Sequence, residues 1–550
     1  MKGRKTLLFF PTGLALLLAL AGSVFFGLAA PARVHLTIIG TTDLHGNILP
    51  VDYYTAKPDT RGLARAATII KRARQENPNL LLLDSGDTIQ GTPLEYYHNR
   101  RNNTPVDPMM LVMNSLHYDA MAVGNHEYNF GLKVLEKARR EAQFPWLSAN
   151  TYDKDTNHTH FTPYLIKEVA GVRIGILGLT TPGIPHWDNA QNYEGLEFRE
   201  PVSEAKKWVA VLRDNAKVDL VVVAMHMGLA EDLNTGTINP GQVQSENEAL
   251  AVARQVPGVN VILMGHTHRD LPSLVVNGVL LTQADYWGKH VARVDIYFDK
   301  DSSGRWQVAA AAARTIATDA AVEPDAESLR LAEPYNRETN NWLGQVIGGS
   351  SAELSAREGR FRDTAILDLV QRVQLEAGKA DVSLAANFNT QARIPKGPVT
   401  VREIAGLYPY ENTLVVLEVT GRQLRAALEH SAEYFRSYEP GKAAAELVDE
   451  RIPAYNFDIG EGVNYDLDIS KPVGERIQNL SFQGRPVLPE QKFRLATNNY
   501  RANGGGGYTM YKDAPVVYRS SELIRDLIID WVELHQTIPA QPNENWRIVP

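Results

Sequence analysis

Short apolar runs recur through the first half of the chain and alternate with stretches that read as helices. The apolar runs cover residues 35–40, 80–83, 120–123, 173–179, 220–224 and 259–264. Helices are predicted between some of these runs, at residues 63–75 and 132–142. Continuous apolar strands that alternate with helices indicate an α/β layered domain with a buried sheet.

A polar motif follows five of these apolar runs. In chain order, the motifs are Thr-Thr-Asp-Leu-His, Asp-Ser-Gly-Asp, Gly-Asn-His-Glu, Met-His-Met-Gly and Gly-His-Thr-His. Ligands of open α/β sheets bind beyond the carboxyl ends of the strands. We therefore expect the five motifs to converge on one edge of the sheet.

The second half of the chain has the pattern of a separate domain. The chain has 550 residues, and single cores stop growing at roughly 250–300 residues. A charged helical stretch begins near residue 323, and a strand and a helix are predicted beyond it at residues 413–419 and 422–435. We predict four segments: an N-terminal export segment (1–32), a first domain (33–322), a linker helix (323–346) and a second domain (347–550).

The N-terminal segment has the features of an export signal. Lys2, Arg4 and Lys5 precede an apolar run over residues 6–30, and small residues around Ala29 offer a cleavage site. The run is close to the roughly 20 residues that span a bilayer, so a membrane tether through residues 6–30 is the alternative. In both cases we expect the folded domains in the periplasm or the extracellular space.

Composition and charge remove several classes of function. The chain has no cysteine, which excludes disulfides, thiolate metal ligands and a cysteine nucleophile. The net charge of −8 argues against a protein that coats a nucleic-acid polymer. Twelve of the fourteen histidines precede residue 291, so histidine-based chemistry is expected in the first half.

The polar motifs together offer donors for two divalent metal ions. Imidazole, carboxylate and amide oxygen ligands suit Mn, Zn, Fe or Co. The candidate ligands are Asp43, His45, Asp87, Asn125, His226, His266 and His268. Each motif alone is a weak signal, because a lone histidine after a strand more often has a structural role. All five motifs in one order indicate a site where two ions cleave a phosphate ester.

The order of these motifs resembles that of the calcineurin-like metallophosphoesterases. The resemblance implies a four-layer α/β/β/α domain. It also implies two ligand sets that share Asp87: Asp43, His45, Asp87 and His268 for one ion, and Asp87, Asn125, His226 and His266 for the other. His126 would stand beside the leaving oxygen as a general acid or charge stabiliser, and a structural histidine is the alternative.

Beyond the export segment, the chain resembles the 5′-nucleotidase family, in which this metal domain precedes an α/β nucleotide-binding domain. The stretches that carry the resemblance are residues 124–131, 161–167, 455–465 and 496–502. They are most similar to the periplasmic 2′,3′-cyclic-nucleotide 2′-phosphodiesterase/3′-nucleotidases. By this resemblance Tyr410 and Tyr500 stack on the base, and Asn412 lies near it. Without the resemblance, tyrosines that pack in the core would be the simpler interpretation.

Two departures from typical 5′-nucleotidases favour the cyclic-nucleotide branch. Asn129 stands where those enzymes have an aspartate that orients the catalytic histidine, and an amide cannot stabilise an imidazolium by charge. Gly506 stands where they often have an aspartate that contacts the base. Arg393 matches a phosphate-binding arginine of the family, with a solvated surface arginine as the alternative.

We therefore expect a monomeric, exported enzyme that converts 2′,3′-cyclic nucleotides to 3′-nucleotides and then to nucleosides and phosphate. The substrate would be a small nucleotide, and no binding of nucleic-acid polymers is expected. The alternatives are a 5′-nucleotidase or nucleotide-sugar hydrolase, a related sulfur-ester hydrolase, and a nucleotide-binding surface protein without activity. We also expect motion between the two domains about the linker helix, because the metals and the tyrosines lie on different domains and must meet.

Overall fold

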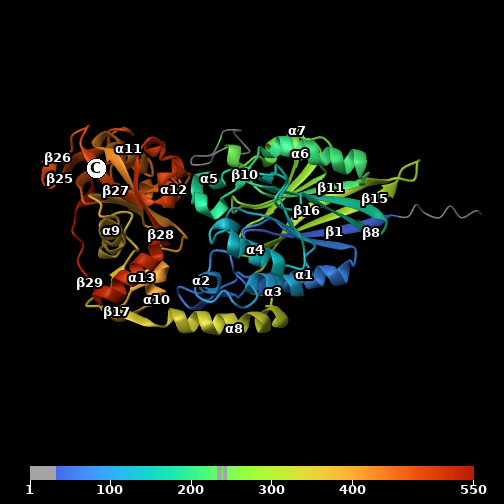
Figure 1. Ribbon diagram of the computed structural model, residues 1–550, viewed down its shortest axis with the longest axis horizontal. Coiled ribbons are helices and arrows are strands. Elements are labelled where there is room, and N and C mark those ends of the chain that lie inside the picture. The colour runs from blue at the N-terminus through green and yellow to red at the C-terminus, as the bar shows by residue number, and fades with distance from the viewer. Residues whose placement is uncertain (1–32, 232–237, 239–243, 550) are drawn as a thin grey trace, which may run out of the picture.

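The structure is a computed structural model that describes residues 33–231, 238 and 244–549. It has two lobes, and the long helix α8 (Ala326–Leu343) runs along one side of the molecule from the first lobe to the second (Figure 1). The predicted export segment lies outside the described residues. Within the described part of the chain, no helix is long and apolar enough to cross a membrane.

Two six-stranded sheets form the centre of the first lobe. The first sheet has the order β16 (Trp306–Ala317), β15 (His290–Lys300), β1 (Val34–Thr41), β4 (Leu80–Asp84), β5 (Ala120–Ala122), β6 (Trp146–Leu147). The second has the order β13 (Asp270–Val276), β14 (Val279–Ala284), β12 (Val261–Met264), β11 (Leu220–His226), β9 (Val172–Thr180), β8 (Tyr164–Val169). In each sheet the central strands pair in parallel. Antiparallel pairs lie toward the edges, at β1–β15 and β15–β16 in the first sheet and at β13–β14 and β8–β9 in the second.

The two sheets pack face to face, and helices cover their outer faces. Ile38 of β1 and Ile176 of β9 belong to one buried apolar cluster between the sheets. Helices α1 (Leu63–Glu76) and α3 (Pro108–Ser115) pack on the first sheet, and α6 (Pro201–Ala210) and α7 (Ala249–Gln255) pack on the second. This is the expected four-layer α/β/β/α arrangement, in which amphipathic helices bury their apolar side against the sheets.

The five polar motifs end strands of both sheets, which corrects the expectation of one shared edge. The first three motifs follow β1, β4 and β5 of the first sheet, and the last two follow β11 and β12 of the second. Apolar patterning identifies a buried strand but does not tell which of two stacked sheets contains it. The motifs still meet, because the strands of both sheets end on the same side of the lobe.

The second lobe is built on a five-stranded sheet with helices on both faces. Its strand order is β23 (Asp458–Glu461), β19 (Val382–Ala386), β27 (Lys492–Asn498), β22 (Thr413–Thr420), β28 (Val516–Leu523). Helices α9 (Ala365–Gly378) and α13 (Ile524–His535) cover one face, and α11 (Gly421–Ala432) covers the other. This lobe is therefore the second α/β domain that the sequence predicts.

A buried apolar cluster continues from one lobe into the other through α8. Trp342 of α8 stacks on Tyr96 of the first lobe with ring centroids 5.4 Å apart, and Tyr408 of the second lobe belongs to the same cluster. The apolar contact between the lobes holds the relative position of the two domains in this conformation.

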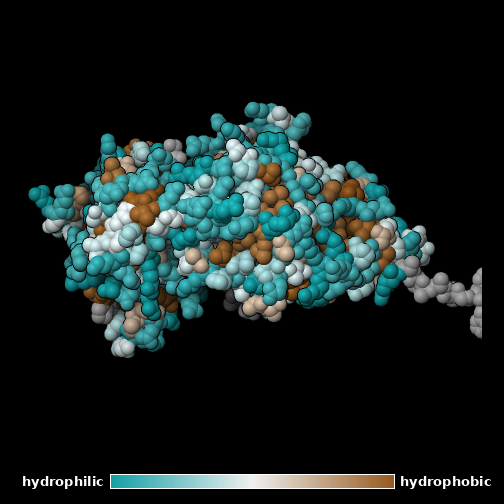
Figure 2. Space-filling model, turned by 90° about the horizontal axis from the view of Figure 1, so that it is seen from below, coloured by the Kyte–Doolittle hydropathy of each residue, from teal (hydrophilic) through white to brown (hydrophobic). Residues whose placement is uncertain are grey.

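Seen from below, the surface is largely hydrophilic with separate hydrophobic patches (Figure 2).

Candidate metal centre and the adjoining cavity

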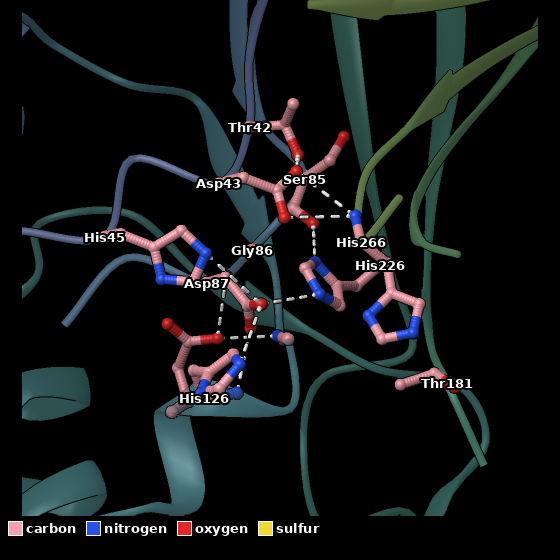
Figure 3. A network of polar contacts seen from close by, with 12 residues as sticks. Thr42, Asp43, His45, Ser85, Gly86, Asp87, His126, Thr181, His226 and His266 are labelled. Atoms are coloured by element: carbon pink, nitrogen blue, oxygen red, sulfur yellow. Dashed lines mark hydrogen bonds and ion pairs between the residues drawn. The ribbon is translucent and has the colours of Figure 1, made fainter. Parts of the chain in front are cut away.

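Two groups of candidate metal ligands lie side by side at the strand ends of the first lobe. One group is Asp43, His45 and His268, and the other is Asp87, His226 and His266. Within each group the ligand atoms lie within 4.8 Å of one another. Figure 3 shows side chains from the loops of both sheets pointing toward a common centre. Six of the seven predicted ligands are thus in two sets of three.

The loops that carry these ligands have an unusual backbone. Five of the seven predicted ligands have positive φ angles: Asp43 (50°), His45 (48°), Asp87 (59°), His266 (72°) and His268 (51°). This left-handed conformation costs a residue with a side chain roughly 1–2 kcal/mol. Backbone hydrogen bonds between the loops hold it, such as Asp43 N to Gly86 O at 2.9 Å and His45 N to Asp87 O at 2.8 Å. Strain of this kind is typical of functional sites.

Hydrogen bonds orient two of the imidazoles toward the centre. Nδ1 of His45 lies 3.0 Å from the carbonyl oxygen of Gln90, and Nδ1 of His226 lies 2.7 Å from that of Ser85. A carbonyl only accepts, so each Nδ1 carries a proton, and Nε2 is the nitrogen that faces the other candidate ligands. Nε2 of His226 is 2.9 Å from Oδ2 of Asp87. A hydrogen bond from Nδ1 to a carbonyl oxygen, as in these two residues, is usual for histidines that bind a metal through Nε2.

The protonation states of four ligands also suit metal binding. Burial lowers the pKa of His45 to about 4 and that of His266 to about 3, so both imidazoles are neutral. Burial opposes the charge of Asp87, but the imidazoles of His226 and His126 hold its pKa well below the ordinary value. Burial also favours a higher pKa for Asp43, but the neighbouring His268 outweighs this effect and lowers the pKa below its ordinary value. Neutral imidazole and ionised carboxylate are the forms that bind cations.

Asn125 provides a further sign that the residues fit a cation. Its side chain is 6% exposed, and its buried Oδ1 has no hydrogen-bond partner. A buried amide oxygen without a partner is costly unless a ligand satisfies it. This oxygen belongs to the Gly-Asn-His-Glu motif, close to Asp87. The donor set of imidazoles, carboxylates and one amide oxygen therefore fits two divalent cations of the predicted kinds.

The last residue of that motif, Glu127, holds two of the loops together. Its buried carboxyl accepts hydrogen bonds from the backbone N–H groups of Gly124 (2.7 Å), Asp87 (3.0 Å) and Thr88 (2.5 Å). Burial and the charge of Asp87 raise its pKa to about 7. Only glycine fits at position 124, because a Cβ atom there would overlap the Asp87 carboxylate. The motif thus fixes the position of Asp87 as well as supplying side chains of its own.

His126 lies at the rim of the centre, where a substrate can reach it. Its side chain is 33% exposed, and its Nε2 is 3.9 Å from Oδ2 of Asp87. Its Nδ1 is 2.6 Å from Oδ1 of Asn129, so Asn129 contacts the imidazole as the resemblance implies. The geometry allows Nε2 to reach a group that is bound beside the metal ligands.

A cavity of about 430 Å³ extends from these residues to the second lobe. Of the predicted site residues, nine line it: Asp87, Asn125, His126, Asn129, His266, His268, Tyr410, Asn412 and Tyr500. Asp43, His45 and His226 are buried beside these residues. The structure therefore places the metal-ligand candidates and the two tyrosines around one space.

The two neighbouring tyrosines of the Leu-Tyr-Pro-Tyr motif have different environments. Tyr408 is fully buried, and its hydroxyl accepts hydrogen bonds from Nδ2 of Asn412 (3.3 Å) and of Asn498 (3.2 Å). Tyr410 is 39% exposed and faces the cavity, with its ring edge-on to Phe388. Tyr408 thus packs in the core, while Tyr410 presents an aromatic surface to the cavity.

Arg393 lies away from this space. It is in the short strand β20 (Arg393–Ile394), its side chain is 61% exposed, and it forms an ion pair with Glu353 at 3.5 Å. It is not among the described residues that line the cavity. In this conformation Arg393 has the position of a solvated surface residue, and its role in phosphate binding stays a prediction.

The residues that line the cavity but were not predicted as site residues include Asp188, Glu246 and Tyr455. Tyr455 begins one of the stretches that resemble the 5′-nucleotidase family, so that resemblance was the signal that could have identified it. Asp188 and Glu246 follow segments without a motif, and only the folded chain brings them to the cavity.

Gly506 has a structural reason for being glycine. Its φ is 71°, and an added Cβ would stand 2.6 Å from Nη1 of Arg501 and would overlap the Asn456 side chain. Arg501 is itself buried and paired with Asp458, with Nε and Oδ2 2.8 Å apart. A side chain at position 506 would therefore require the buried Asn456 and Arg501 side chains to shift.

Comparison with known proteins agrees with this geometry. Residues 36–270 match the calcineurin-like phosphoesterase family, and residues 343–513 match the 5′-nucleotidase C-terminal domain. A 2′,3′-cyclic-nucleotide 2′-phosphodiesterase/3′-nucleotidase of Haemophilus influenzae is 31% identical, with 97% of this chain and 90% of that protein covered. The protein of the same name from Yersinia enterocolitica is 32% identical, with the same coverage of 97% and 90%.

A further sequence relative and a solved structure agree with this assignment. The trifunctional nucleotide phosphoesterase YfkN of Bacillus subtilis is 30% identical over 95% of this chain, which spans only 39% of that protein. The crystal structure of a Staphylococcus aureus protein described as a 5′-nucleotidase, in complex with alpha-ketoglutarate, superposes with a TM-score of 0.83 at 27% identity. It covers 94% of this chain and 100% of that one. The chain therefore belongs to the 5′-nucleotidase family and is a metal-dependent phosphoric ester hydrolase.

Proposed function

We propose that this enzyme hydrolyses 2′,3′-cyclic nucleotides to 3′-nucleotides, and these to nucleosides and phosphate. The observation that carries the proposal is the shared cavity, in which metal-ligand candidates form one wall and tyrosines of the second lobe form the other. The base would stack between Tyr410 and Tyr500 while the phosphate reaches the metal ligands. Base–aromatic stacking contributes about 1–3 kcal/mol per base and tolerates different bases.

The choice of the cyclic branch rests on Asn129 and Gly506. Both positions differ from typical 5′-nucleotidases, and a side chain at position 506 would require the buried Asn456 and Arg501 side chains to shift. The relatives with about 31% identity over nearly the whole chain bear the name of this activity. Residues 33–322, 323–346 and 347–550 would form the first domain, the linker helix and the substrate-binding domain.

Both reactions are hydrolyses at phosphorus. The oxygen of a water molecule forms a new bond to phosphorus, and the bond from phosphorus to a ribose oxygen breaks. The leaving oxygen takes a proton from Nε2 of His126, while the proton that water loses passes to solvent. Two divalent ions, of Mn, Zn, Fe or Co, would supply the Lewis acidity that activates the water and neutralises the phosphate. The seven predicted ligands would hold them, with Asp87 shared.

The test is turnover of four substrates by the enzyme loaded with Mn²⁺: 2′,3′-cyclic AMP, 3′-AMP, 5′-AMP and UDP-glucose. We expect the first two to have the highest kcat/KM. A preference for 5′-AMP or UDP-glucose would contradict the cyclic assignment and leave the phosphoesterase assignment intact. Lack of turnover of all four would favour a nucleotide-binding protein without activity, and metal analysis of the purified protein identifies the ions.

We also propose that the enzyme is exported and acts as a monomer in the periplasm or outside the cell. The basic residues and the apolar run before residue 31 support export. Mass spectrometry of the mature protein from cell fractions tests this, because cleavage near Ala29 and a tether through residues 6–30 predict different masses. Recovery of the full-length protein in the cytoplasmic fraction would contradict export.

A further inference from the structure

Asn129 connects His126 to a buried carboxyl group that no sequence motif indicated. Oδ1 of Asn129 lies 2.6 Å from Nδ1 of His126, and Nδ2 of Asn129 donates to Oδ2 of Asp188 at 3.0 Å. Asp188 is 7% exposed and follows the short helix α5 (Ile184–Trp187). The three side chains form one hydrogen-bonded row beside the cavity, which all three residues line.

The chemistry of the three groups determines the direction of these hydrogen bonds. Burial raises the pKa of Asp188, but donors from the Asn192 side chain (2.7 Å), the Asn129 side chain and the Asn189 backbone (2.7 Å) all favour the carboxylate. A carboxylate only accepts, so the NH₂ group of Asn129 must face Asp188. Its oxygen therefore faces His126, and Nδ1 of His126 must carry the proton.

We propose that Asp188 is a positioning residue for His126 and acts through Asn129. The row holds the ring so that Nε2 faces the cavity. The carboxylate of Asp188 accepts a hydrogen bond from the NH₂ group of Asn129, so the amide oxygen is held toward Nδ1 of His126 and the ring keeps its orientation. The inference rests on the proposed hydrolysis, in which the leaving ribose oxygen receives a proton from Nε2 of His126.

The loop that carries Asp188 also contacts the second lobe. Nδ2 of Asn189 donates to Oγ1 of Thr413 at 2.9 Å, and the backbone N–H of Thr413 donates to Oδ1 of Asn499 at 3.0 Å. Asn499 precedes Tyr500 in helix α12 (Asn499–Ala502). The support of His126 is thus in contact with the wall that would bind the base. The row is complete in the conformation in which both walls face the same cavity.

The first experiment compares Asp188→Asn with the wild type on two esters. The nucleoside of 3′-AMP is a poor leaving group and needs a proton, whereas p-nitrophenolate leaves without one. We expect kcat for 3′-AMP to fall about 10–100-fold with KM nearly unchanged. This is the usual loss when a residue that hydrogen-bonds to a functional side chain is replaced. The kcat for p-nitrophenyl phosphate should change less than about threefold. A loss of equal size on both esters would overturn the proposal.

The second experiment moves the charge. Asn129→Asp alone places two carboxyl groups side by side and should lower kcat for 3′-AMP. Asn129→Asp combined with Asp188→Asn restores one carboxylate and one amide in exchanged order, and we expect kcat within about tenfold of the wild type. In a His126→Ala background, Asp188→Asn should have no further effect on kcat. Additive losses in that background, or no recovery in the double variant, would refute the proposal.

The control is Asn192→Ala, which removes hydrogen bonds to the Asp188 carboxylate (2.7 Å) and to the backbone carbonyl of Asn129 (3.3 Å) but none between the three side chains of the row. It should leave the ratio of the two kcat values unchanged. A shift of this ratio as large as that of Asp188→Asn would assign Asp188 to loop structure alone. The proposed function is judged separately, from the substrate preference of the wild type. If 5′-AMP proves the better substrate, the same ratio is measured with 5′-AMP.

Discussion

The two walls of the cavity use left-handed backbone in opposite ways. In the metal wall, residues that need their side chains adopt it, with φ from 48° at His45 to 72° at His266. In the loop that follows Tyr500 of the facing wall, glycines adopt it: φ is 89° at Gly504, 71° at Gly506 and 87° at Gly507. Tyr500 itself lies in the short helix α12.

The difference follows from what each wall must present. The candidate metal ligands come from five separate loops and their side chains must converge, so the backbone of these loops cannot everywhere take its lowest-energy conformation. A stacking ring only needs a flat surface, and neighbouring glycines can provide the turn at no steric cost. We infer that the metal wall gives up stability for function, whereas the tyrosine wall does not. The following changes test this comparison, from the largest expected effect to the smallest.

Removal of the shared carboxylate tests the metal wall most directly. In Asp87→Asn we expect turnover of every phosphate ester to fall by more than about 100-fold. Replacement of a residue that only hydrogen-bonds to a metal ligand already lowers activity about 10–100-fold, and Asp87 is itself a predicted ligand. Metal content, measured by mass spectrometry, should fall with it. Asp301→Asn, the same substitution in the hairpin between β15 and β16, is the matched control and should retain full activity. Unchanged turnover by Asp87→Asn would exclude the two-metal proposal.

A covalent link between the lobes tests whether the two walls must separate. The Cβ position of Gly406 in helix α10 (Val401–Leu407) lies 3.6 Å from Cβ of Tyr54, within the range for a disulfide. In a chain without native cysteines, Tyr54→Cys with Gly406→Cys should arrest most turnover when oxidised, because opening must part the apolar contact between the lobes.

The reduced double variant serves as the control for this link and should recover its turnover on addition of dithiothreitol. Full turnover by a protein whose crosslink is confirmed on a non-reducing gel would show that domain motion about the linker helix is not required.

Truncation of one tyrosine tests the second wall by itself. Tyr410→Ala should raise KM for nucleotides by a factor that corresponds to about 1–3 kcal/mol of lost stacking, and leave p-nitrophenyl phosphate turnover unchanged. Tyr518→Ala is the matched control, since Tyr518 is also 39% exposed but lies outside the cavity. Equal KM values for wild type and Tyr410→Ala would remove the tyrosine from the nucleotide site.

The strain in the metal wall is measurable as stability. At His268 (φ 51°), replacement by Gly should give a protein about 1 kcal/mol more stable than replacement by Ala, although both are inactive. Thermal unfolding with a chelator present compares the two. At Lys206, an exposed position in α6, the order should reverse, with Gly less stable than Ala by about 0.5–1 kcal/mol. The same order at both positions would contradict strain at His268.

The sequence predicted the elements of this fold closely where apolar runs were continuous. The runs predicted at residues 35–40, 80–83 and 220–224 are the strands Val34–Thr41, Leu80–Asp84 and Leu220–His226. It also identified the residues that form the two metal-ligand groups, because each follows a strand and belongs to a short motif. It did not assign these strands to two sheets, because the apolar pattern of a buried strand is the same in either one.

Local sequence by itself determined the strands, the metal-ligand candidates and, through the family resemblance, the tyrosines, because each depends on neighbours along the chain. Only the tertiary structure decided which residues share the cavity. It placed Asp188 behind Asn129, it put Arg393 on the surface, and it buried Tyr408 while exposing Tyr410. These outcomes depend on contacts between segments that lie far apart in the sequence, and no local pattern contains that information.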